Sequence, residues 1–274
     1  MLGRSLIKTF KNYNICGISR EENLELTNQF NFDLSDFKKI KSELIDYEPE
    51  IIIHCAANVS LKNCEINKSS AYNLHVNSSK ELAKKFPNAK FIYISTDSIF
   101  NGLSSQYSED SEPNPLNYYA STKYFGELEI LNNSNSPLII RTSIIGQNLK
   151  KSSFTDWVIK ELGQSKKIDG YNNIFFNPIH VDFLSEIILK VVTQNNFPFK
   201  ILNVGSFNKI SKYDYIALLA KKFNFNLNLV NNVSVQNFKD GIERPFNTFL
   251  NSERLFNTLK LKYYIKDSIQ KIII

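Results

Sequence analysis

A tyrosine and a lysine four positions apart are the strongest chemical signal in the sequence. In the segment YASTK, Tyr119 and Lys123 would lie on one face of a helix, about one turn apart. A tyrosine hydroxyl is a poor acid near neutral pH because its free pKa is about 10. A nearby lysine ammonium stabilises the phenolate and is expected to lower that pKa. The pair could then exchange a proton with a carbonyl or alcohol oxygen, although the same spacing also occurs on helices without a catalytic role.

A polar cluster precedes this pair by one loop. The apolar run at residues 91–94 is typical of a buried strand, and Ser95, Thr96 and Asp97 follow it directly. In open α/β sheets, ligands bind at the carboxyl ends of the strands. The hydroxyl of Thr96 is therefore placed where it could bond the reacting oxygen, and a single loop could bring it to Tyr119.

The elements that must position these residues alternate between strands and helices. Apolar, β-branched runs predict strands over residues 13–18, 51–53, 91–94, 138–140 and 201–204. Apolar residues at helical spacing predict helices over residues 36–45, 69–86 and 118–131. This alternation predicts right-handed βαβ units and an α/β fold, a Rossmann-type doubly wound parallel sheet. The run at 51–53 is expected to be buried on both faces.

The pattern becomes less regular after residue 145. Helices are predicted over residues 154–162, 181–192 and 213–223, without an internal repeat or a low-complexity linker. We therefore predict a dinucleotide-binding domain over residues 1–145, with return segments at about 178–204. A small substrate-binding lobe would be formed mainly by residues 146–274.

Small and polar residues after the early strands suit a bound dinucleotide. Cys55, Ala56 and Ala57 follow a predicted strand, and small side chains there let a flat cofactor lie close to the backbone. Asp33 could bond an adenine amino group. Ser35 is expected to cap the helix that follows it.

One basic residue bears on the choice of cofactor. Arg20 follows the predicted strand at 13–18, where an acidic residue would hold the ribose hydroxyls of NAD and an arginine accommodates the extra phosphate of NADP. The position favours NADPH and leaves NADH possible. An exposed arginine without a role is the alternative interpretation.

Composition and charge exclude several other classes of protein. The net charge is +6, but lysines and arginines are adjacent only in pairs, so no basic stripe indicates a nucleic-acid binder. The three cysteines lack the spacing of a disulfide scaffold or a zinc site. Cys16 and Cys55 lie in apolar runs and are expected in the core. No run has transmembrane length and the first residues lack a signal peptide, so we expect a cytoplasmic protein without membrane contact.

Neither the histidines nor the single tryptophan indicates a binding site in the sequence. His54, His75 and His180 are far apart, so no metal site is predicted. His54 lies within a predicted strand and is expected to be a core histidine with its hydrogen bonds satisfied. Trp157, on the helix predicted over residues 154–162, could stack on a base or a sugar, but a packing role is the expected one.

The order of these segments resembles that of the extended short-chain dehydrogenase/reductases, in particular the dTDP-4-dehydrorhamnose reductase-like group. The resemblance runs almost from end to end, in the pieces HCAANVSLKNCE, YNLHVNSSKELA, IYISTDSIFNG, NYYASTKYFGELEI, IIRTSIIG, FNPIHVDFLSEII, ILNVGS and RPFNTFLNSERL.

The resemblance implies roles for individual residues. Thr96, Tyr119 and Lys123 would form the catalytic triad, with Tyr119 as the proton donor and Lys123 also holding the nicotinamide ribose. The cofactor path would be lined by Gly3, Arg20, Asp33, Leu34, Cys55, Ala56 and Ala57. Asn77 would support the sheet near the active site. The substrate side would hold Asp97, Ile144 and Arg244.

The chain departs from the family pattern at its start. The family opens with a strand and a glycine-rich turn, and Gly3 matches only the last glycine of that turn, which lets helix and strand pack closely. The strand would lie between those predicted at 13–18 and 51–53. Each backbone group left unpaired in the core would cost about 1–3 kcal/mol. We therefore expect that the start is late or that the chain is a fragment.

Two departures concern the substrate. Ile144 stands where the rhamnose-forming reductases have a tryptophan, and in the segment NIFFNPI at residues 173–179 only Pro178 matches. The fold and the redox residues are thus better predicted than the sugar.

Three functions stay open. The first is NADPH-dependent reduction of the 4-keto group of a nucleotide-activated deoxysugar, which the resemblance connects with polysaccharide and dTDP-rhamnose synthesis. The second is epimerisation or dehydration of a nucleotide-sugar, although the extra acid/base pair is not visible. The third is a non-catalytic binding subunit, like the regulatory subunit of methionine adenosyltransferase. A homodimer is possible for each.

Overall fold

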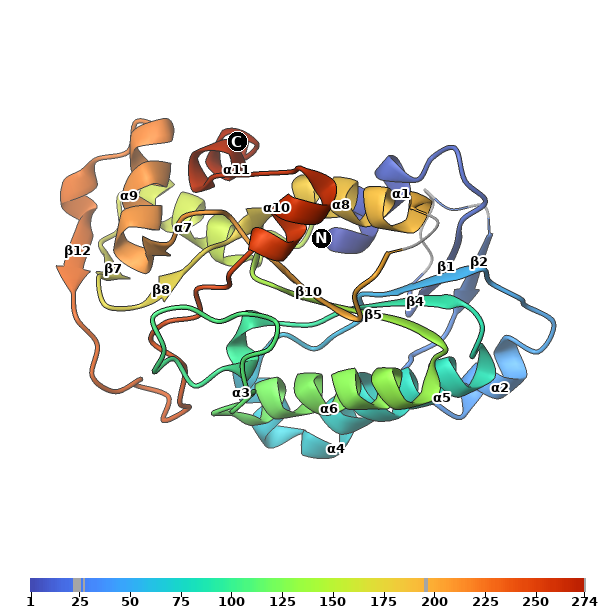
Figure 1. Cartoon of the computed structure of the whole chain (residues 1–274). Helices are drawn as coiled ribbons and strands as arrows, with labels where there is room; N and C mark the ends of the chain where they lie inside the picture. The colour runs from blue at the N-terminus through green and yellow to red at the C-terminus, as the bar shows by residue number, and fades with distance from the viewer. Residues whose placement is uncertain (22–25, 27, 195–196, 274) are drawn as a thin grey trace.

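A parallel sheet of four strands forms the centre of the computed structural model, which describes residues 1–21, 26, 28–194 and 197–273. The strand order is β10, β5, β4, β3, with β3 (Ile51–His54), β4 (Lys90–Ile94), β5 (Ser136–Thr142) and β10 (Ile201–Val204). Helices cover both faces of the sheet (Figure 1). They include α5 (Ser78–Lys85) and α6 (Tyr118–Asn133) on one face and α8 (Val181–Thr193) on the other. The predicted α/β fold with a Rossmann-type parallel sheet is confirmed.

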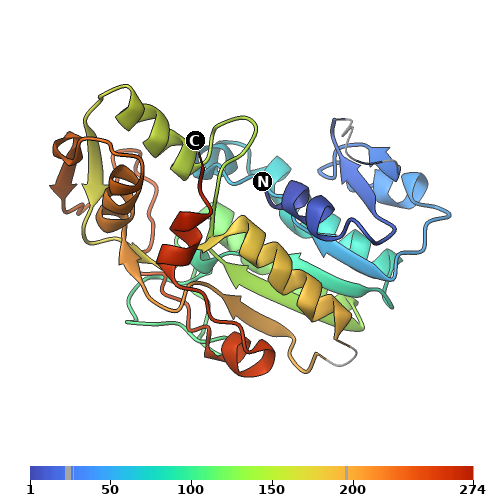
Figure 2. The same ribbon diagram turned by 90° about the horizontal axis from the view of Figure 1, so that it is seen from above.

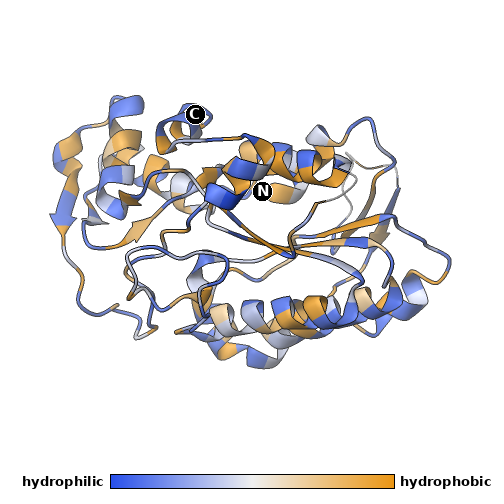
Figure 3. Ribbon diagram, viewed as in Figure 1, coloured by the Kyte–Doolittle hydropathy of each residue, from blue (hydrophilic) through white to orange (hydrophobic). Residues whose placement is uncertain are grey.

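Alternating residues of β4 supply the hydrophobic cores on the two faces. Ile92 and Ile94 belong to the cluster under α8, whereas Phe91 and Tyr93 belong to the cluster under α5 and α6. This is the period of two expected for a strand with both faces covered. Figure 3 shows the apolar sides of the helices turned towards the sheet. These cores fix where the carboxyl end of β4 lies relative to α6.

The first two strands form a separate sheet (Figure 2). β1 (Cys16–Ser19) and β2 (Asn28–Asn31) pair in parallel with each other. Among the described residues, no strand pairs with β3 on the side away from β4. Both faces of β3 are covered as predicted, since Ile51 and Ile53 pack against the core under α8 and Ile52 against the core under α5 and α6. Residues 51–53 are only half-buried because β3 is an edge strand.

The N-terminal helix α1 (Leu2–Thr9) packs on α8 through a small polar cluster inside an apolar contact. The Ser5 hydroxyl donates to an oxygen of Asp182 at 2.7 Å and lies 2.8 Å from the Ser185 hydroxyl. These bonds hold the beginning of the chain next to the carboxyl end of β3.

A second hydrophobic core lies in the later half of the chain. It packs α7 (Phe154–Gly163), α9 (Lys212–Lys222) and α11 (Ile265–Gln270) against short strands. Those strands form three two-stranded pairs: β7 (Ile168–Tyr171) with β12 (Val230–Val233), β8 (Phe175–Phe176) with β11 (Ile210–Ser211), and β6 (Ile144–Ile145) with β9 (Ile179–His180). The predicted boundary between a cofactor domain and a substrate lobe at residue 145 stays a prediction.

The helix predicted over residues 69–86 is divided into three parts. α4 (Lys68–Tyr72) is followed by a π-helical turn (Asn73–Asn77) and then by α5. Ahead of it, α3 (Leu61–Ile66) is capped by the Ser60 side chain, which accepts from the backbone N–H of Asn63. The remaining elements are α10 (Glu253–Leu259) and the 3-10 helices Asp97–Ile99 and Leu227–Leu229.

The predicted cap at Ser35 is wrong. α2 (Lys39–Glu43) begins later, and its N-cap residue, Lys38, makes no side-chain cap bond. Instead, a carboxylate oxygen of Asp33 accepts from the Ser35 backbone N–H at 2.8 Å. The side chain that stabilises the local backbone is therefore Asp33 and not Ser35, since a short acidic side chain can accept from the backbone N–H two residues further on.

Two of the three cysteines are less buried than predicted. Cys55 is exposed and Cys16 is half-buried, whereas Cys64 is buried. Cys55 lies beyond the end of β3, and Cys16 begins a strand of the small separate sheet, so neither is enclosed by the main cores. Within the described ranges, no helix is both long and apolar enough to cross a membrane.

Candidate active site

The side chains predicted to be catalytic meet where β4 ends and α6 begins. Thr96 lies two residues beyond the end of β4, and its Oγ1 accepts from the backbone N–H of Ser98 at 3.2 Å. Tyr119 lies in the first turn of α6, whose start is fixed by Asn117 Oδ1 accepting from the Ala120 N–H at 3.0 Å. The Thr96 side chain lies close enough to Tyr119 to act on the pKa of its hydroxyl. The structure thus brings together two residues that the sequence separates by a loop.

Lys123 is enclosed one turn further along α6. It is 2% exposed, and its ammonium lies 3.9 Å from the centroid of the Tyr93 ring. Burial lowers the pKa of Lys123 to about 7, although the charges of Glu127 and Cys55 oppose this change. A lysine with this pKa is present in both its charged and its neutral form near neutral pH.

The pKa of Tyr119 is raised, not lowered as the spacing predicted. Burial is the main cause, the Thr96 side chain acts in the opposite direction, and the Asp97 carboxylate raises the pKa further. Burial dominates because the phenolate would lose its hydration. The Tyr119 hydroxyl therefore keeps its proton at neutral pH, as a proton donor must.

A histidine that the sequence did not single out lies beside Tyr119. His75, in the π-helical turn, is fully buried, and its ring meets the Tyr119 ring edge-on at 5.8 Å between centroids. Its Nε2 accepts from the Asn58 backbone N–H at 2.9 Å, so the proton resides on Nδ1, which lies 2.8 Å from the Thr122 hydroxyl. Burial, assisted by the charge of Lys123, lowers the pKa of His75 to about 3. The ring is a neutral support for the tyrosine.

The second group that the sequence reasoning missed is a buried ion pair below Lys123. Arg141, at the end of β5, bonds Glu127 of α6 with Nη2 at 2.8 Å and Nε at 3.2 Å from the carboxylate. The Ser95 hydroxyl also donates to Glu127, and Arg141 Nη1 donates to the backbone oxygen of Glu109 at 3.1 Å. Glu127 follows Lys123 by one helical turn, so the spacing that revealed the tyrosine–lysine pair could also have revealed this carboxylate.

The predicted cofactor residues lie along the end of β3 and the start of α1. An added Cβ at Gly3 would lie 3.8 Å from Cys55 Sγ, which is ordinary van der Waals contact. The first turn of α1 is therefore next to the exposed Cys55, and Ala56 and Ala57, both half-buried, continue this path. Gly3 and Cys55 thus lie side by side, and the role of these four residues in binding a cofactor stays a prediction.

The other three predicted cofactor residues are more dispersed. Asp33 is half-buried in its own turn, and Leu34 packs in the core at 7% exposed. Arg20 is exposed just beyond β1. Asn77, which the resemblance placed near the active site, donates to the side chain of Asn73 at 2.8 Å within the π-helical turn.

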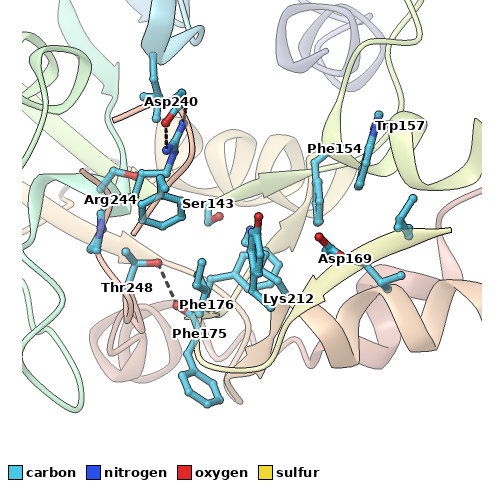
Figure 4. A pocket seen from close by; sticks show the side chains of 18 of the residues that line it. Ser143, Phe154, Trp157, Asp169, Phe175, Phe176, Lys212, Asp240, Arg244 and Thr248 are labelled. Carbon is cyan, nitrogen blue, oxygen red and sulfur yellow. Dashed lines mark hydrogen bonds and ion pairs between the residues drawn. The ribbon is translucent and has the colours of Figure 1, made fainter. Parts of the chain in front are cut away.

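A cleft of about 760 Å³ adjoins this group, because Asp97 and Ser98, which follow Thr96, and Asn117, two residues before Tyr119, line it. Residues from both halves of the chain line it, among them Asp97, Ser98, Asn117, Ser143, Phe154, Trp157, Asp169, Phe176, Lys212, Asp240, Arg244 and Thr248 (Figure 4). Its size is within the range of sites that enclose small-molecule ligands.

Two of the three predicted substrate residues line this cleft. Asp97 is buried, and its carboxylate accepts from the Thr248 hydroxyl at 2.5 Å. Burial raises the pKa of Asp97, although that bond and the charge of Lys212 act against the change. Arg244 forms a bidentate pair with Asp240, with Nη1 at 2.8 Å from Oδ1.

Ile144, the third predicted substrate residue, does not line the cleft. It lies in β6, opposite Ile179 of β9, and packs against the core under α8. The residue before it, Ser143, faces the cleft (Figure 4).

The cleft also contains an aromatic group that was expected to pack in the core. Trp157 is 40% exposed and stacks on Phe154 at 6.0 Å between ring centroids. Lys212 lies beside them, with its ammonium 3.3 Å from the centroid of Phe176. Lys212 gave no signal in the sequence, because only the pairing of β8 with β11 places the start of α9 at this cleft.

Comparison with known proteins identifies the family. A family model described as the RmlD substrate binding domain matches residues 1–273. A methionine adenosyltransferase 2 subunit beta from Danio rerio is 28% identical over 267 residues, covering 93% of this chain and 81% of that protein. A dTDP-4-dehydrorhamnose reductase from Aggregatibacter actinomycetemcomitans is 27% identical over 275 residues, covering 93% of this chain and 88% of that protein.

A solved structure agrees with the fold. The dTDP-4-dehydrorhamnose reductase from Bacillus anthracis in complex with NADP superposes with a TM-score of 0.82 at 23% identity, over 93% of this chain and 97% of that chain. Because the family model spans nearly all of the sequence, the chain belongs to the RmlD substrate-binding domain family.

Proposed function

We propose that the chain is an NADPH-dependent reductase of the 4-keto group of a nucleotide-activated deoxysugar. The observation that carries the proposal is the placement of Thr96 close to Tyr119, one helical turn from the buried side chain of Lys123. Asp97, the neighbour of Thr96, lines a cleft of ligand size. The likeness to a dTDP-4-dehydrorhamnose reductase supports the substrate class, and the NADP complex of a relative supports the cofactor.

The residues along the cofactor path fit a dinucleotide. Gly3 has no side chain to cover the end of β3, and Cys55 is exposed there rather than packed in a core. Among the described residues, the Lys123 ammonium has no hydrogen-bond acceptor, so its donors are available to ribose hydroxyls. When bound, NADPH supplies the hydride. The exposed Arg20 is the residue that would distinguish it from NADH.

Reduction of a ketone also needs a proton, and Tyr119 is placed to give it. The raised pKa of Tyr119 keeps its hydroxyl protonated until the carbonyl oxygen acquires negative charge. Thr96 would hold that oxygen through its own hydroxyl. The transfer leaves a phenolate, which the ammonium form of Lys123 stabilises. The product is an alcohol.

The test is oxidation of NADPH in the presence of a thymidine diphosphate 4-keto-deoxysugar. Replacing Tyr119→Phe removes only the donated proton, and kcat should fall by roughly 10²–10⁴-fold, while NADPH binding is retained. The matched control is Tyr118→Phe, because the ring of this adjacent tyrosine faces the Lys68 ammonium, 5.3 Å from its centroid. Unchanged turnover in Tyr119→Phe would overturn the proposed mechanism.

A binding role is the second candidate, because a methionine adenosyltransferase 2 subunit beta matches 93% of the chain. The separation of β1 and β2 from the main sheet also favours it, since a dinucleotide normally crosses the ends of both sets of strands. This candidate predicts stable association with a methionine adenosyltransferase catalytic subunit that Tyr119→Phe leaves unchanged. Absence of such a complex, together with turnover of NADPH, would exclude it.

A further inference from the structure

One cation in the cleft is fixed in place without a partner of its own. Lys212 is the first residue of α9, and its backbone N–H donates to the Ile174 oxygen at 2.9 Å. The Ser211 side chain caps the same helix by accepting from the Asp214 N–H at 3.0 Å. Together with the pairing of β8 and β11, these bonds fix the base of the Lys212 side chain at the cleft wall.

The ammonium of Lys212 is surrounded by aromatic rings. It lies 3.3 Å from the ring centroid of Phe176 and 4.8 Å from that of Phe154. In the part of the chain that the structure describes, no carboxylate lies within the 4.0 Å of an ion pair and no hydrogen-bond acceptor meets the ammonium. Ring faces attract a cation but do not replace the hydrogen bonds lost with water. The three N–H donors are therefore available to a ligand.

Asp97 does not serve as that partner. Its charge acts on Lys212 from beyond contact distance, and its oxygens already accept from Thr248, Thr96 and Ser98. Burial lowers the pKa of Lys212 to about 8, and Asp97 opposes this change. The side chain thus stays mostly charged at neutral pH.

The other cations of the cleft differ from Lys212. Arg244 is bound bidentately by Asp240, and Lys167 and Lys239 are exposed to solvent. Lys212 is therefore the cleft cation, within the described ranges, that is both shielded and unpaired. A charge held in this way is expensive unless a ligand supplies the acceptors.

The position of Lys212 along the cleft indicates which part of a ligand it meets. On one side is Thr248, whose hydroxyl donates to Asp97, the neighbour of Thr96; on the other are Phe154 and the Trp157 that stacks on it (Figure 4). A nucleoside diphosphate sugar presents its groups in the same order, namely a reacting sugar, two phosphates and a flat base. We propose that Lys212 binds the phosphate groups of the substrate and sets the preference of this cleft for nucleoside diphosphates. This inference rests on the proposed function, because it assumes that the sugar reaches Tyr119.

Trp157 provides a direct measurement of binding, since it is the one tryptophan of the chain and lines the same cleft. Its fluorescence is titrated with thymidine diphosphate and with thymidine. The wild-type chain should bind the diphosphate about tenfold or more tightly, because hydrogen bonds to a charged group contribute about 1.5–3 kcal/mol. An equal affinity for both compounds would overturn the proposal without any variant.

The variant Lys212→Met keeps the length of the side chain and removes its charge. It should lose the preference for thymidine diphosphate and keep its affinity for thymidine. The matched control is Lys209→Met, which removes another lysine that lies over an aromatic ring, 5.1 Å from the Phe175 centroid, but does not line the cleft. Lys212→Arg should retain the preference, which keeps the test decisive if the methionine variant does not fold.

The outcomes separate this inference from the proposed function. Preferential binding of thymidine diphosphate that Lys212→Met leaves intact would overturn the role of Lys212 and leave the reductase proposal standing. The wild-type chain could instead show no NADPH oxidation but a preference for thymidine diphosphate that depends on Lys212. This result would overturn the reductase proposal and leave the phosphate site standing.

Discussion

Two regions of the molecule carry buried charge, and they treat it in opposite ways. Below the proposed catalytic residues, the Glu127 carboxylate is bound by Arg141 and by the Ser95 hydroxyl, so the protein itself supplies its hydrogen bonds. In the cleft, Lys212 has aromatic rings around it and no acceptor among the described residues. A charged group whose hydrogen bonds are all made by its own chain stabilises one arrangement of the fold. A charged group without such bonds is available to a ligand.

The largest expected effect on stability concerns the Glu127 and Arg141 ion pair. Arg141→Met would leave the carboxylate of Glu127 buried without its partner, and the free energy of unfolding should fall by about 3–5 kcal/mol. Urea denaturation measures this directly. In contrast, Lys212→Met should leave the free energy of unfolding unchanged or raise it, because the cation removed has no bond within the chain.

The double variant Glu127→Leu/Arg141→Met refines this prediction. Removing both charges together should cost much less than the sum of the two single replacements, because neither is left unpaired. Equal destabilisation by Arg141→Met and by Lys212→Met would contradict the distinction between the two regions.

The next effect on stability comes from tight packing around Gly126, close to the proposed catalytic residues. An added Cβ at Gly126 would contact the Tyr93 hydroxyl and approach the backbone oxygen of His75 to 2.5 Å. Gly126→Ala should therefore destabilise the chain by about 1–3 kcal/mol. Gly3→Ala is the control: its Cβ would make only an ordinary contact with Cys55, and alanine favours a helix by about 1 kcal/mol. Thermal unfolding of both variants should move in opposite directions.

The smallest effect, counted for one group and one pH unit, is a dependence of stability on pH. His54 and His75 have folded pKa values of about 3, below the ordinary histidine pKa of about 6.5, chiefly because both are buried. Between these values the unfolded chain binds more protons, so this part of the stability is complete above about pH 6.5 and is lost as the pH falls. Each histidine should lower the free energy of unfolding by about 1 kcal/mol per pH unit.

The cleft should respond to acid in the opposite sense. The raised folded pKa of Asp97 means that the folded chain takes up its proton first, which stabilises the fold as the pH falls. Urea denaturation between about pH 7 and about pH 5 should show a net loss of stability, and His75→Gln should reduce its slope. An unchanged slope in that variant would show that His75 is not the neutral support described above.

The sequence predicted the features that depend on local patterns. The strand at residues 91–94, the polar residues after it and the start of α6 were all visible as short-range spacing, and they place Thr96 near Tyr119. The fold class followed from the alternation of such segments. These residues are close because of one loop, so local information was sufficient.

The missed residues depend on contacts between distant segments. His75 reaches Tyr119 only because α4 and α5 are joined by a π-helical turn, and Arg141 reaches Glu127 only because β5 lies under α6. The sequence also did not show that residues 51–53 would be only half-buried, since edge or central position depends on the neighbours of a strand. No pattern within a single segment contains this information.

The π-helical turn at Asn73–Asn77 has a further consequence for how this helix could change in evolution. A π-helical turn holds one residue more than an α-helical turn, so it is equivalent to an insertion within a helix. Deleting one residue would rotate the parts before and after it by about 100° relative to each other. A homologue with one residue fewer in this turn could retain the packing of α5 on α6 or the contact of His75 with Tyr119, but it could not retain both. The length of this segment is thus constrained as strictly as the identity of the tyrosine that it supports.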